Sequence, residues 1–197
     1  KSITENTLSK GSYQSSAFET FARLIDITGL RFVNVGANIG TSCLNAHAVG
    51  FRDFIALEPV KSNFDFLTSN FTPDDSKISL HQLAAGNEAG KAVINLHPSS
   101  GGRHSLVKKF GPKAEEIEIV RLDDFISREP SVLWIDTEGF EYKVLLGSEE
   151  FVRSSVKALC LEVTPKLLGD DFPKLIEFLR THFKTFYNVS GQKIEPD

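Results

Sequence analysis

The sequence lacks the features that mark membrane-spanning, secreted and metal-binding proteins. It contains no run of about 18 consecutive apolar residues, so we expect no transmembrane helix and no membrane partner. Residues 1–16 have no apolar core, which a signal peptide needs, and we expect a flexible lead-in there, followed by one domain over residues 17–197. The two cysteines, Cys43 and Cys160, have no metal-ligand spacing and lie among apolar residues. They favour buried thiols, a cytoplasmic location and the absence of a metal site.

The sequence also lacks an excess of basic residues. It has 22 Lys and Arg against 26 Asp and Glu, a net charge of −4, which argues against a dedicated nucleic-acid-binding protein. Neither a G-x-S-x-G motif nor a P-loop is present, so hydrolase and NTPase functions have little support. With 197 residues, 41% of them hydrophobic and 24% charged, the composition is typical of one globular domain.

Short apolar runs alternate with helical patterns along the chain. Strand candidates occur at residues 31–35, 54–57, 79–84, 132–135 and 158–163. The last two are continuous apolar runs, which are typical of strands buried on both faces of a parallel sheet. Helical spacing of apolar residues, or a proline suited to a first helical turn, occurs at residues 17–28, 41–49, 59–71, 140–152 and 172–183. This alternation predicts an α/β fold of the Rossmann-like, doubly wound kind, with a mostly parallel seven-stranded sheet.

Two segments depart from this alternation. Residues 91–97 and 116–122 both fit strands, and a Gly- and Lys-rich link joins them, so we expect a small inserted antiparallel pair. Residues 185–189 and 193–195 flank Ser190-Gly191, which is a hairpin signal. We expect this hairpin to add an antiparallel strand at the edge of the sheet.

A glycine-containing loop joins the first predicted strand to its helix. Gly36 permits a sharp turn where a side chain would block a ligand, and Gly40 permits close helix packing. The free N–H groups at the helix start can face an anionic or polar group. The spacing is G-x-x-x-G, with Asn38 where dinucleotide-binding loops carry a middle glycine, which counts against NAD or FAD. An ordinary strand-to-helix turn is the alternative.

A second candidate for ligand binding is Glu58, at the end of the second predicted strand. A carboxylate at this position can accept hydrogen bonds from both hydroxyls of a ribose. The alternative is a carboxylate that stabilises the N-terminus of the next helix. Together with the glycine loop, Glu58 indicates a cofactor that contains a nucleoside.

The sequence resembles the FkbM-type S-adenosylmethionine-dependent methyltransferases over roughly residues 32–189. The motifs that carry the resemblance are Asn34-Val35-Gly36-Ala37-Asn38-Ile39-Gly40, Leu57-Glu58-Pro59 with Asn63 and Asn70, Leu83-Ala84-Ala85-Gly86, Arg121-Leu122-Asp123-Asp124, Ile135-Asp136-Thr137-Glu138-Gly139-Phe140-Glu141 and Leu161-Glu162. The D-x-E-G-x-E block is the most specific of these. The glycine loop alone fits any class I methyltransferase.

The resemblance implies a class I methyltransferase domain that binds S-adenosylmethionine. It implies that Gly36, Asn38 and Gly40 cradle the methionine part, that Glu58 holds the ribose, and that Ala84 and Ala85 lie near the adenine. The full set implied for the cofactor is Asn34, Gly36, Ala37, Asn38, Gly40, Glu58, Pro59, Ala84, Ala85 and Asp136.

Two residues depart from the family pattern. Asn34 stands where many members carry Asp, which removes a negative charge near the amino group of the cofactor. Trp134 stands where Lys is common, which removes a charge partner for Asp136 and is expected to alter the acceptor pocket.

The candidate catalytic residues are Asp136, Glu138 and His104. Asp136 follows a central strand and is the first candidate for a base or for acceptor positioning; capping of the next helix is the alternative. Glu138 and Glu141 begin that helix, where stabilisation of the helix dipole is the alternative role. His104 lies in the insertion that faces the presumed cleft, although a surface histidine is the simpler interpretation.

Residues 103–113 form a basic loop with no acidic residue. It contains Arg103, His104, Lys108, Lys109 and Lys113. Such a loop can attract a phosphorylated or carboxylated acceptor, and the alternative is a solvated charged surface.

We therefore expect methyl transfer from S-adenosylmethionine to a hydroxyl of a small molecule or sugar, which can be anionic. The oxygen acceptor rests on the resemblance alone. The alternatives are a methyltransferase-like binding domain without turnover, an NAD-dependent oxidoreductase, and an RNA methyltransferase, which the acidic net charge disfavours.

Overall fold

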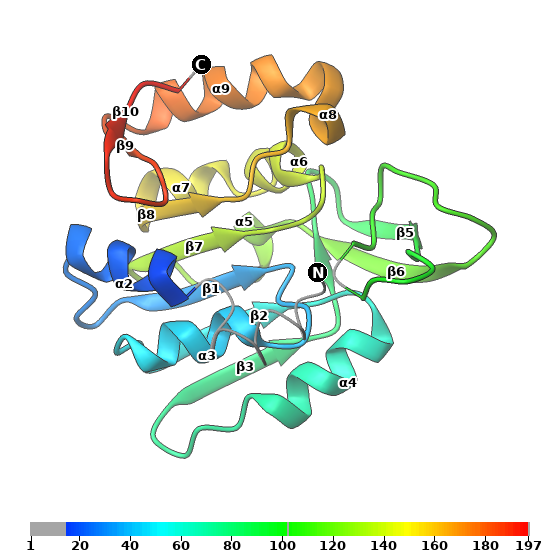
Figure 1. Cartoon of the computed structure of the whole chain (residues 1–197), viewed down its shortest axis with the longest axis horizontal. Helices are drawn as coiled ribbons and strands as arrows, with labels where there is room; N and C mark the ends of the chain where they lie inside the picture. Colours follow the sequence, from blue (N-terminus) through cyan, green and yellow to red (C-terminus); the bar gives the residue numbers. More distant parts are fainter. Residues whose placement is uncertain (1–14, 102, 197) are drawn as a thin grey trace.

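The computed structural model describes residues 15–101 and 103–196, and a parallel sheet lies at its centre (Figure 1). Five strands follow the order β3-β2-β1-β7-β8, and all neighbouring pairs are parallel. Their bounds are β1 (Arg31–Val35), β2 (Asp53–Leu57), β3 (Lys77–His81), β7 (Ser131–Ile135) and β8 (Val156–Leu161). The chain adds β2 and β3 on one side of β1 and later adds β7 and β8 on the other. The strand order thus reverses between β1 and β7, where open α/β sheets place their ligands.

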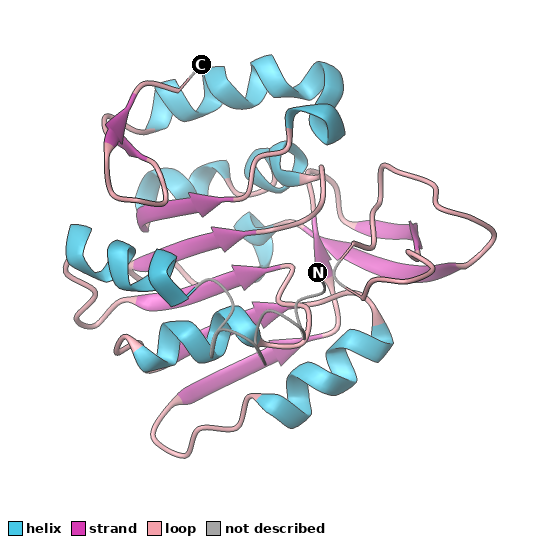
Figure 2. Cartoon of the chain, viewed as in Figure 1, coloured by secondary structure: helices cyan, strands magenta, loops and turns pink. Residues whose placement is uncertain are grey.

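Helices cover both faces of this sheet (Figure 2). Their bounds are α2 (Ser15–Leu24), α3 (Thr41–Ala48), α4 (Lys61–Asn70), α5 (Leu122–Phe125), α6 (Glu141–Leu146), α7 (Glu149–Ser154), α8 (Pro165–Leu168), η1 (Gly169–Asp171) and α9 (Phe172–His182). Phe32 packs with residues of α2, α3 and α4, whereas Val33 packs with residues of α5 to α9. Successive strand residues point to opposite faces, so β1 contributes to a hydrophobic core on each face of the sheet. Helices on both faces of a parallel sheet are what the predicted doubly wound arrangement requires.

The helix boundaries differ from the prediction by more than one residue in α2, in α4 and in the helix expected over residues 140–152. The first described helix ends at Leu24, and α4 begins at Lys61 rather than at Pro59. The helix expected over residues 140–152 is divided into α6 and α7. The division has a physical reason: a Cβ at Gly147 would lie 1.8 Å from the Gly86 carbonyl oxygen, and an Asp123 carboxylate oxygen accepts the Phe151 amide at 2.8 Å and starts α7.

Most of the predicted lead-in, residues 1–14, falls outside the described residues, while Ser15 and Ser16 belong to α2. No helix within residues 15–101 and 103–196 has the length and apolar character needed to cross a lipid bilayer.

The prediction of a seven-stranded sheet is wrong for the described residues, because the central sheet has five strands. The predicted edge hairpin, β9 (Phe186–Tyr187) and β10 (Lys193–Ile194), pairs only with itself. The inserted antiparallel pair is found as β5 (Gly90–Asn95) and β6 (Ala114–Val120). The two-residue strand β4 (Ala84–Ala85) joins it in parallel with β6, so the run expected as one strand over 79–84 is shared between two sheets.

The carboxyl ends of four central strands are aligned at one edge. Val35 is paired with Leu57 and with Ile135, and Ile135 is paired with Leu161. The residues that follow these strands, namely Gly36, Glu58, Asp136 and Glu162, therefore begin four adjacent loops. This alignment creates the site described next.

Candidate functional site

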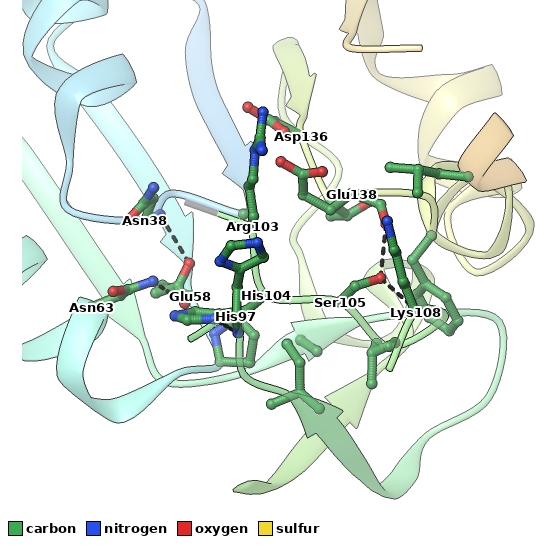
Figure 3. Close-up of a pocket in the computed structure, with 18 of the residues that line it drawn as sticks. Asn38, Glu58, Asn63, His97, Arg103, His104, Ser105, Lys108, Asp136 and Glu138 are labelled. Carbon is green, nitrogen blue, oxygen red and sulfur yellow. Dashed lines mark hydrogen bonds between the residues drawn. The ribbon is translucent and has the colours of Figure 1, made fainter. Parts of the chain in front are cut away.

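A cleft of about 720 Å³ lies between the carboxyl ends of the central strands and the inserted sheet (Figure 3). Its volume is within the range of small-molecule sites. The predicted residues that line it are Gly36, Asn38, Glu58, Pro59, Ala84, Ala85, His104, Asp136 and Glu138. Asn34, Ala37 and Gly40 do not line it.

The loop after β1 makes a tight turn against the loop after β7. Gly36 has φ +84°, and a Cβ there would lie 1.8 Å from the Asp136 carbonyl oxygen, so only glycine fits. Asn38, with φ +51°, donates its backbone N–H to Glu58 at 2.9 Å. The side-chain oxygen of Asn38 is buried and has no hydrogen-bond partner. An acceptor without a donor in a cleft is suited to a ligand N–H or O–H.

Glu58 connects this loop to the start of α4. Its carboxylate is 5% exposed and accepts the backbone N–H groups of Asn38 at 2.9 Å and Val60 at 3.0 Å. The buried side chain of Asn63 lies 3.5 Å away. Burial raises the pKa of Glu58 to about 7, although these donors oppose the shift. The carboxylate stabilises the chain entering α4, as the alternative interpretation expected. It also lines the cleft, where contact with a ribose stays a prediction.

Ala84 and Ala85 are buried and line the cleft from β4. We expected them at the end of the third strand of the central sheet, and the structure instead places them in the inserted sheet, paired with Ile119 and Val120. Their small side chains and that of Pro59 form an apolar wall near Glu58.

Carboxyl groups gather on the other side of the cleft, where β7 and β8 end. Asp136 and Glu162 are hydrogen-bonding neighbours, and Glu138 also faces the cleft. Burial raises the pKa of Asp136 well above its usual value, and the nearby charge of Glu162 raises it further. Burial also raises the pKa of Glu138, while the positive charges of Arg103 and Lys108 oppose that shift. Asp136 therefore holds its proton more strongly than an ordinary carboxylic acid.

Glu138 is held in an uncommon backbone conformation. It has φ +53°, and together with Asn38 it is one of the two non-glycine residues with positive φ in the described chain. Both line the cleft. Such conformations cost on the order of 1–3 kcal/mol and persist where surrounding contacts impose them. Here the Ser105 hydroxyl donates a hydrogen bond to the Glu138 carbonyl at 2.9 Å.

Glu141 supports this loop from beneath and does not line the cleft. One of its oxygens accepts the amides of Thr137 and Gly139 at 3.0 and 3.1 Å, and the Thr137 hydroxyl at 3.1 Å. The residue is buried in the first turn of α6. The structural interpretation of Glu141 at the start of the helix is therefore the one that its contacts support.

His104 lies in the cleft with a defined ring orientation. Its Nδ1 accepts the backbone N–H of His97 at 3.0 Å, so the proton of the neutral ring is on Nε2. Burial lowers the pKa of His104, and the neighbouring His97 lowers it further. A neutral ring that presents an N–H group is the state that these contacts favour.

The structure places three of the residues expected at the site outside the cleft. Asn34 is fully buried, donates to the Cys43 sulfur at 3.5 Å and lies outside the cleft. Gly40 begins α3 with φ +92° and packs against Leu67, and Ala37 belongs to the core. Because their side chains or Cα atoms face the core beside α3 and α4, none of the three borders the cleft.

Trp134 does not alter the acceptor side of the cleft, contrary to the expectation. It stacks on Phe18 with ring centres 4.1 Å apart and lies in the core that contains Phe32. Trp134 is inside the strand and points to the sheet face covered by α2. The acceptor side instead begins at Asp136, after the strand has ended.

Two important cleft residues were not assigned a role from the sequence. Glu162 follows β8 as Asp136 follows β7, so the rule that ligands bind at carboxyl strand ends was a signal for it. Asn63 also lines the cleft, and its side chain donates to the Gly101 carbonyl at 2.8 Å. No local sequence pattern indicates the contact with Gly101, since Asn63 and Gly101 lie 38 residues apart.

Comparison with known proteins gives one family and one fold. Residues 34–184 match the family model described as the methyltransferase FkbM domain. The crystal structure of methyltransferase FkbM from Methylobacillus flagellatus KT is similar, with a TM-score of 0.62 and 20% sequence identity. The alignment covers 88% of this chain and 43% of that protein, so this chain spans less than half of its length. No curated protein matches the sequence.

Proposed function

Because this chain belongs to the family of FkbM methyltransferase domains, we propose that it transfers a methyl group from S-adenosylmethionine to a hydroxyl of a small molecule or sugar. The observation that carries the proposal is one cleft that joins two kinds of group. The glycine loop and Glu58 lie on one side, and Asp136 lies on the other. A methyltransferase needs both, because it must hold a nucleoside cofactor beside a group that handles the acceptor proton.

The residues of the first side are suited to S-adenosylmethionine. Glu58 would accept the ribose hydroxyls, and the unpartnered oxygen of Asn38 would accept a donor from the methionine part. Gly36 lets the loop after β1 pack directly against the Asp136 backbone, where any side chain would clash, and so sets how closely the two sides approach. Ala84, Ala85 and Pro59 would contact the adenine. These roles agree with those that the resemblance implies.

The residues of the second side are suited to an alcohol acceptor. When bound, S-adenosylmethionine supplies a methyl group on a positively charged sulfur. Asp136 would orient the acceptor hydroxyl and take its proton as the oxygen becomes methylated. The raised pKa of Asp136 makes its ionised form a stronger base than an ordinary aspartate. Glu138 and the Nε2–H of His104 would position the acceptor beside it.

The cofactor is tested by thermal unfolding with S-adenosylmethionine, S-adenosylhomocysteine and NAD added separately. A ligand at 100 times its Kd adds about 2.7 kcal/mol, which raises the melting temperature of a chain of this length by roughly 5–10 °C. We expect this increase with both adenosyl compounds and none with NAD. An increase with NAD alone, or with none of the three, would contradict the proposed function.

A matched pair of variants locates the binding site. Glu58→Gln should abolish most of the increase, because it removes the charge from the carboxylate facing the cleft. Glu116→Gln, on the exposed surface of β6, should leave it unchanged. Equal increases for both variants would show that Glu58 does not hold the cofactor.

A further inference from the structure

The inserted segment between β5 and β6 is fixed across the cleft at two points. Near its start, the Gly101 carbonyl accepts the side chain of Asn63, which extends from α4. Further along, the Ser105 hydroxyl donates to the Glu138 carbonyl on the loop after β7. Both anchoring side chains are buried, with 6% of Asn63 and 1% of Ser105 exposed. The segment is therefore attached to both sides of the cleft. We call the side of the glycine loop and Glu58 the cofactor side, after its proposed role, and the side of Asp136, Glu138 and Glu162 the acid side.

Ser105 also fixes the turn that follows it. Its hydroxyl oxygen accepts the amides of Val107 at 3.1 Å and Lys108 at 3.2 Å. Its backbone exchanges two hydrogen bonds with Asn95 on β5, at 2.9 and 3.1 Å. The positions of Arg103 and Lys108, on either side of Ser105, are thus set by a buried residue rather than by a free loop.

Two cations from this segment enter the cleft without an ion-pair partner. Arg103 and Lys108 line it, and among the described residues neither forms an ion pair or a side-chain hydrogen bond. Lys108 lies over the Phe110 ring at 5.3 Å, and Phe110 also lines the cleft. Both cations act electrostatically on Glu138, so they are on the acid side, as Figure 3 shows for the labelled residues. Lys109, next in the chain, does not line the cleft.

A neutral acceptor that displaced water from the cleft would leave these cations without a hydrogen-bonded counter-charge, because Glu138 acts on them only electrostatically. Removing water from such a charge is unfavourable. A phosphate or carboxylate would pair with them through charge-assisted hydrogen bonds, and the arginine can bind either anion with two donors. Asp136 has Glu162 as its hydrogen-bonding neighbour and forms no ion pair with either cation in the described part of the chain. The cations are therefore available to a ligand.

On the basis of the proposed function, we infer that the acceptor is a hydroxylated small molecule that carries a phosphate or carboxylate group. Arg103 and Lys108 bind that anion, and the hydroxyl to be methylated faces Asp136. The inserted segment is then the part of the chain that selects the acceptor.

The inference is tested with three probes that share a sugar ring: glucose 6-phosphate, glucuronate and glucose. Each is titrated by calorimetry into the full chain saturated with S-adenosylhomocysteine. We expect binding of at least one acidic probe, about tenfold or more tighter than glucose, and weaker binding as salt increases. The acidic probe that binds identifies the anion. Failure of both acids to bind, or equal binding of glucose, overturns the inference.

Three variants, each with one positive charge removed, test the roles of Arg103 and Lys108. Arg103→Gln and Lys108→Gln should each weaken binding of the acidic probe by about tenfold, whereas the control Lys109→Gln should leave it unchanged. Arg103→Lys should restore part of the affinity. Thermal unfolding of each variant verifies that the fold is intact. Equal weakening by Lys109→Gln would show a general effect of net charge and would overturn the assignment.

The two proposals fail separately. Binding of S-adenosylhomocysteine is measured first, in its own titration, and its absence contradicts the proposed function. The acidic probes are then titrated into the free protein, where their binding, lost in Arg103→Gln and kept in Lys109→Gln, still supports an anion site. Normal binding of S-adenosylhomocysteine with no binding of the acids contradicts the anion site alone.

Discussion

The two sides of the cleft provide different hydrogen-bond partners for their carboxyl groups. On the cofactor side, Glu58 receives N–H donors from Asn38 and Val60, which are neighbours in sequence or in the adjacent loop. On the acid side, the hydrogen-bonding neighbour of Asp136 is another carboxyl group, that of Glu162. Burial raises the pKa on both sides, but one side gives its carboxylate N–H donors, whereas on the other side a carboxyl group faces another carboxyl group.

This difference separates binding from reactivity. Preformed backbone donors orient a carboxylate without moving, which suits a cofactor that must always bind in the same way. Adjacent carboxyl groups compete for a proton, which suits proton transfer. The comparison predicts that changes on the acid side reduce turnover but not cofactor affinity, and that changes on the cofactor side alter cofactor affinity and stability.

The largest effect is expected at Asp136. Asp136→Asn should reduce methyl transfer by about 100-fold or more, because the acceptor hydroxyl loses its base. Affinity for S-adenosylhomocysteine should change by less than about threefold, or well under 1 kcal/mol. Single-turnover rates and calorimetric titration measure the two quantities. Asp74→Asn, an exposed carboxylate far from the cleft, is the control. An equal loss of cofactor affinity and rate would contradict the separation.

Gly36 provides the next largest effect, on the cofactor side. Gly36→Ala should lower the free energy of unfolding by more than about 3 kcal/mol, since its Cβ would meet the Asp136 carbonyl and its φ is positive. Gly111→Ala is the matched control, because a Cβ at Gly111 meets nothing within 4 Å. Urea unfolding measures both. A small effect of Gly36→Ala would mean that the two loops separate readily.

The cofactor side was largely predictable from the sequence because its parts are local. Gly36 and Glu58 directly follow short strands, Asn38 lies two residues after Gly36, and parallel strands place such residues at one edge. Asp136 was found by the same rule. The rule also applied to Glu162, whose role was missed although its motif was recognised.

The acid side required contacts that no local pattern contains. Ser105 meets Glu138 across 33 residues, and the stacking of Trp134 on Phe18 joins two distant elements. Trp134 was therefore assigned to the wrong surroundings. The strand number failed for a related reason, since two-residue strands such as β9 carry too little pattern to identify their partner.

The dependence of stability on pH gives a direct test of Glu58. Its pKa is about 7 in the fold and 4.5 in the reference state, so the folded protein binds this proton more strongly. The contribution of Glu58 to stability is full below pH 4.5 and is lost as pH rises to about 7, a difference of up to about 3 kcal/mol. Ribose hydroxyls that donate to Glu58 favour its charged form, so affinity for S-adenosylhomocysteine should rise over the same range.

The measurement is urea unfolding across this pH range in three proteins. Glu58→Gln should show a smaller decrease in stability with rising pH than the unchanged chain, and Glu116→Gln should show the same decrease as the unchanged chain. The comparison of slopes removes the contribution of Asp136, which titrates in the same direction in all three. Identical slopes for Glu58→Gln and the unchanged chain would contradict the assignment.

The smallest effect is expected at Ser105, which joins the inserted segment to the acid side. Ser105→Ala removes the hydrogen bond to the Glu138 carbonyl and should lower the free energy of unfolding by about 1–2 kcal/mol. Binding of the acidic probe should weaken a few-fold, because Arg103 and Lys108 lose their fixed positions, while S-adenosylhomocysteine should bind as before. Ser69→Ala, an exposed serine on α4 that bonds only within its own helix, is the control. A parallel loss of affinity for both ligands would show that the segment organises the whole cleft, and the two sides would then have to be treated as one unit.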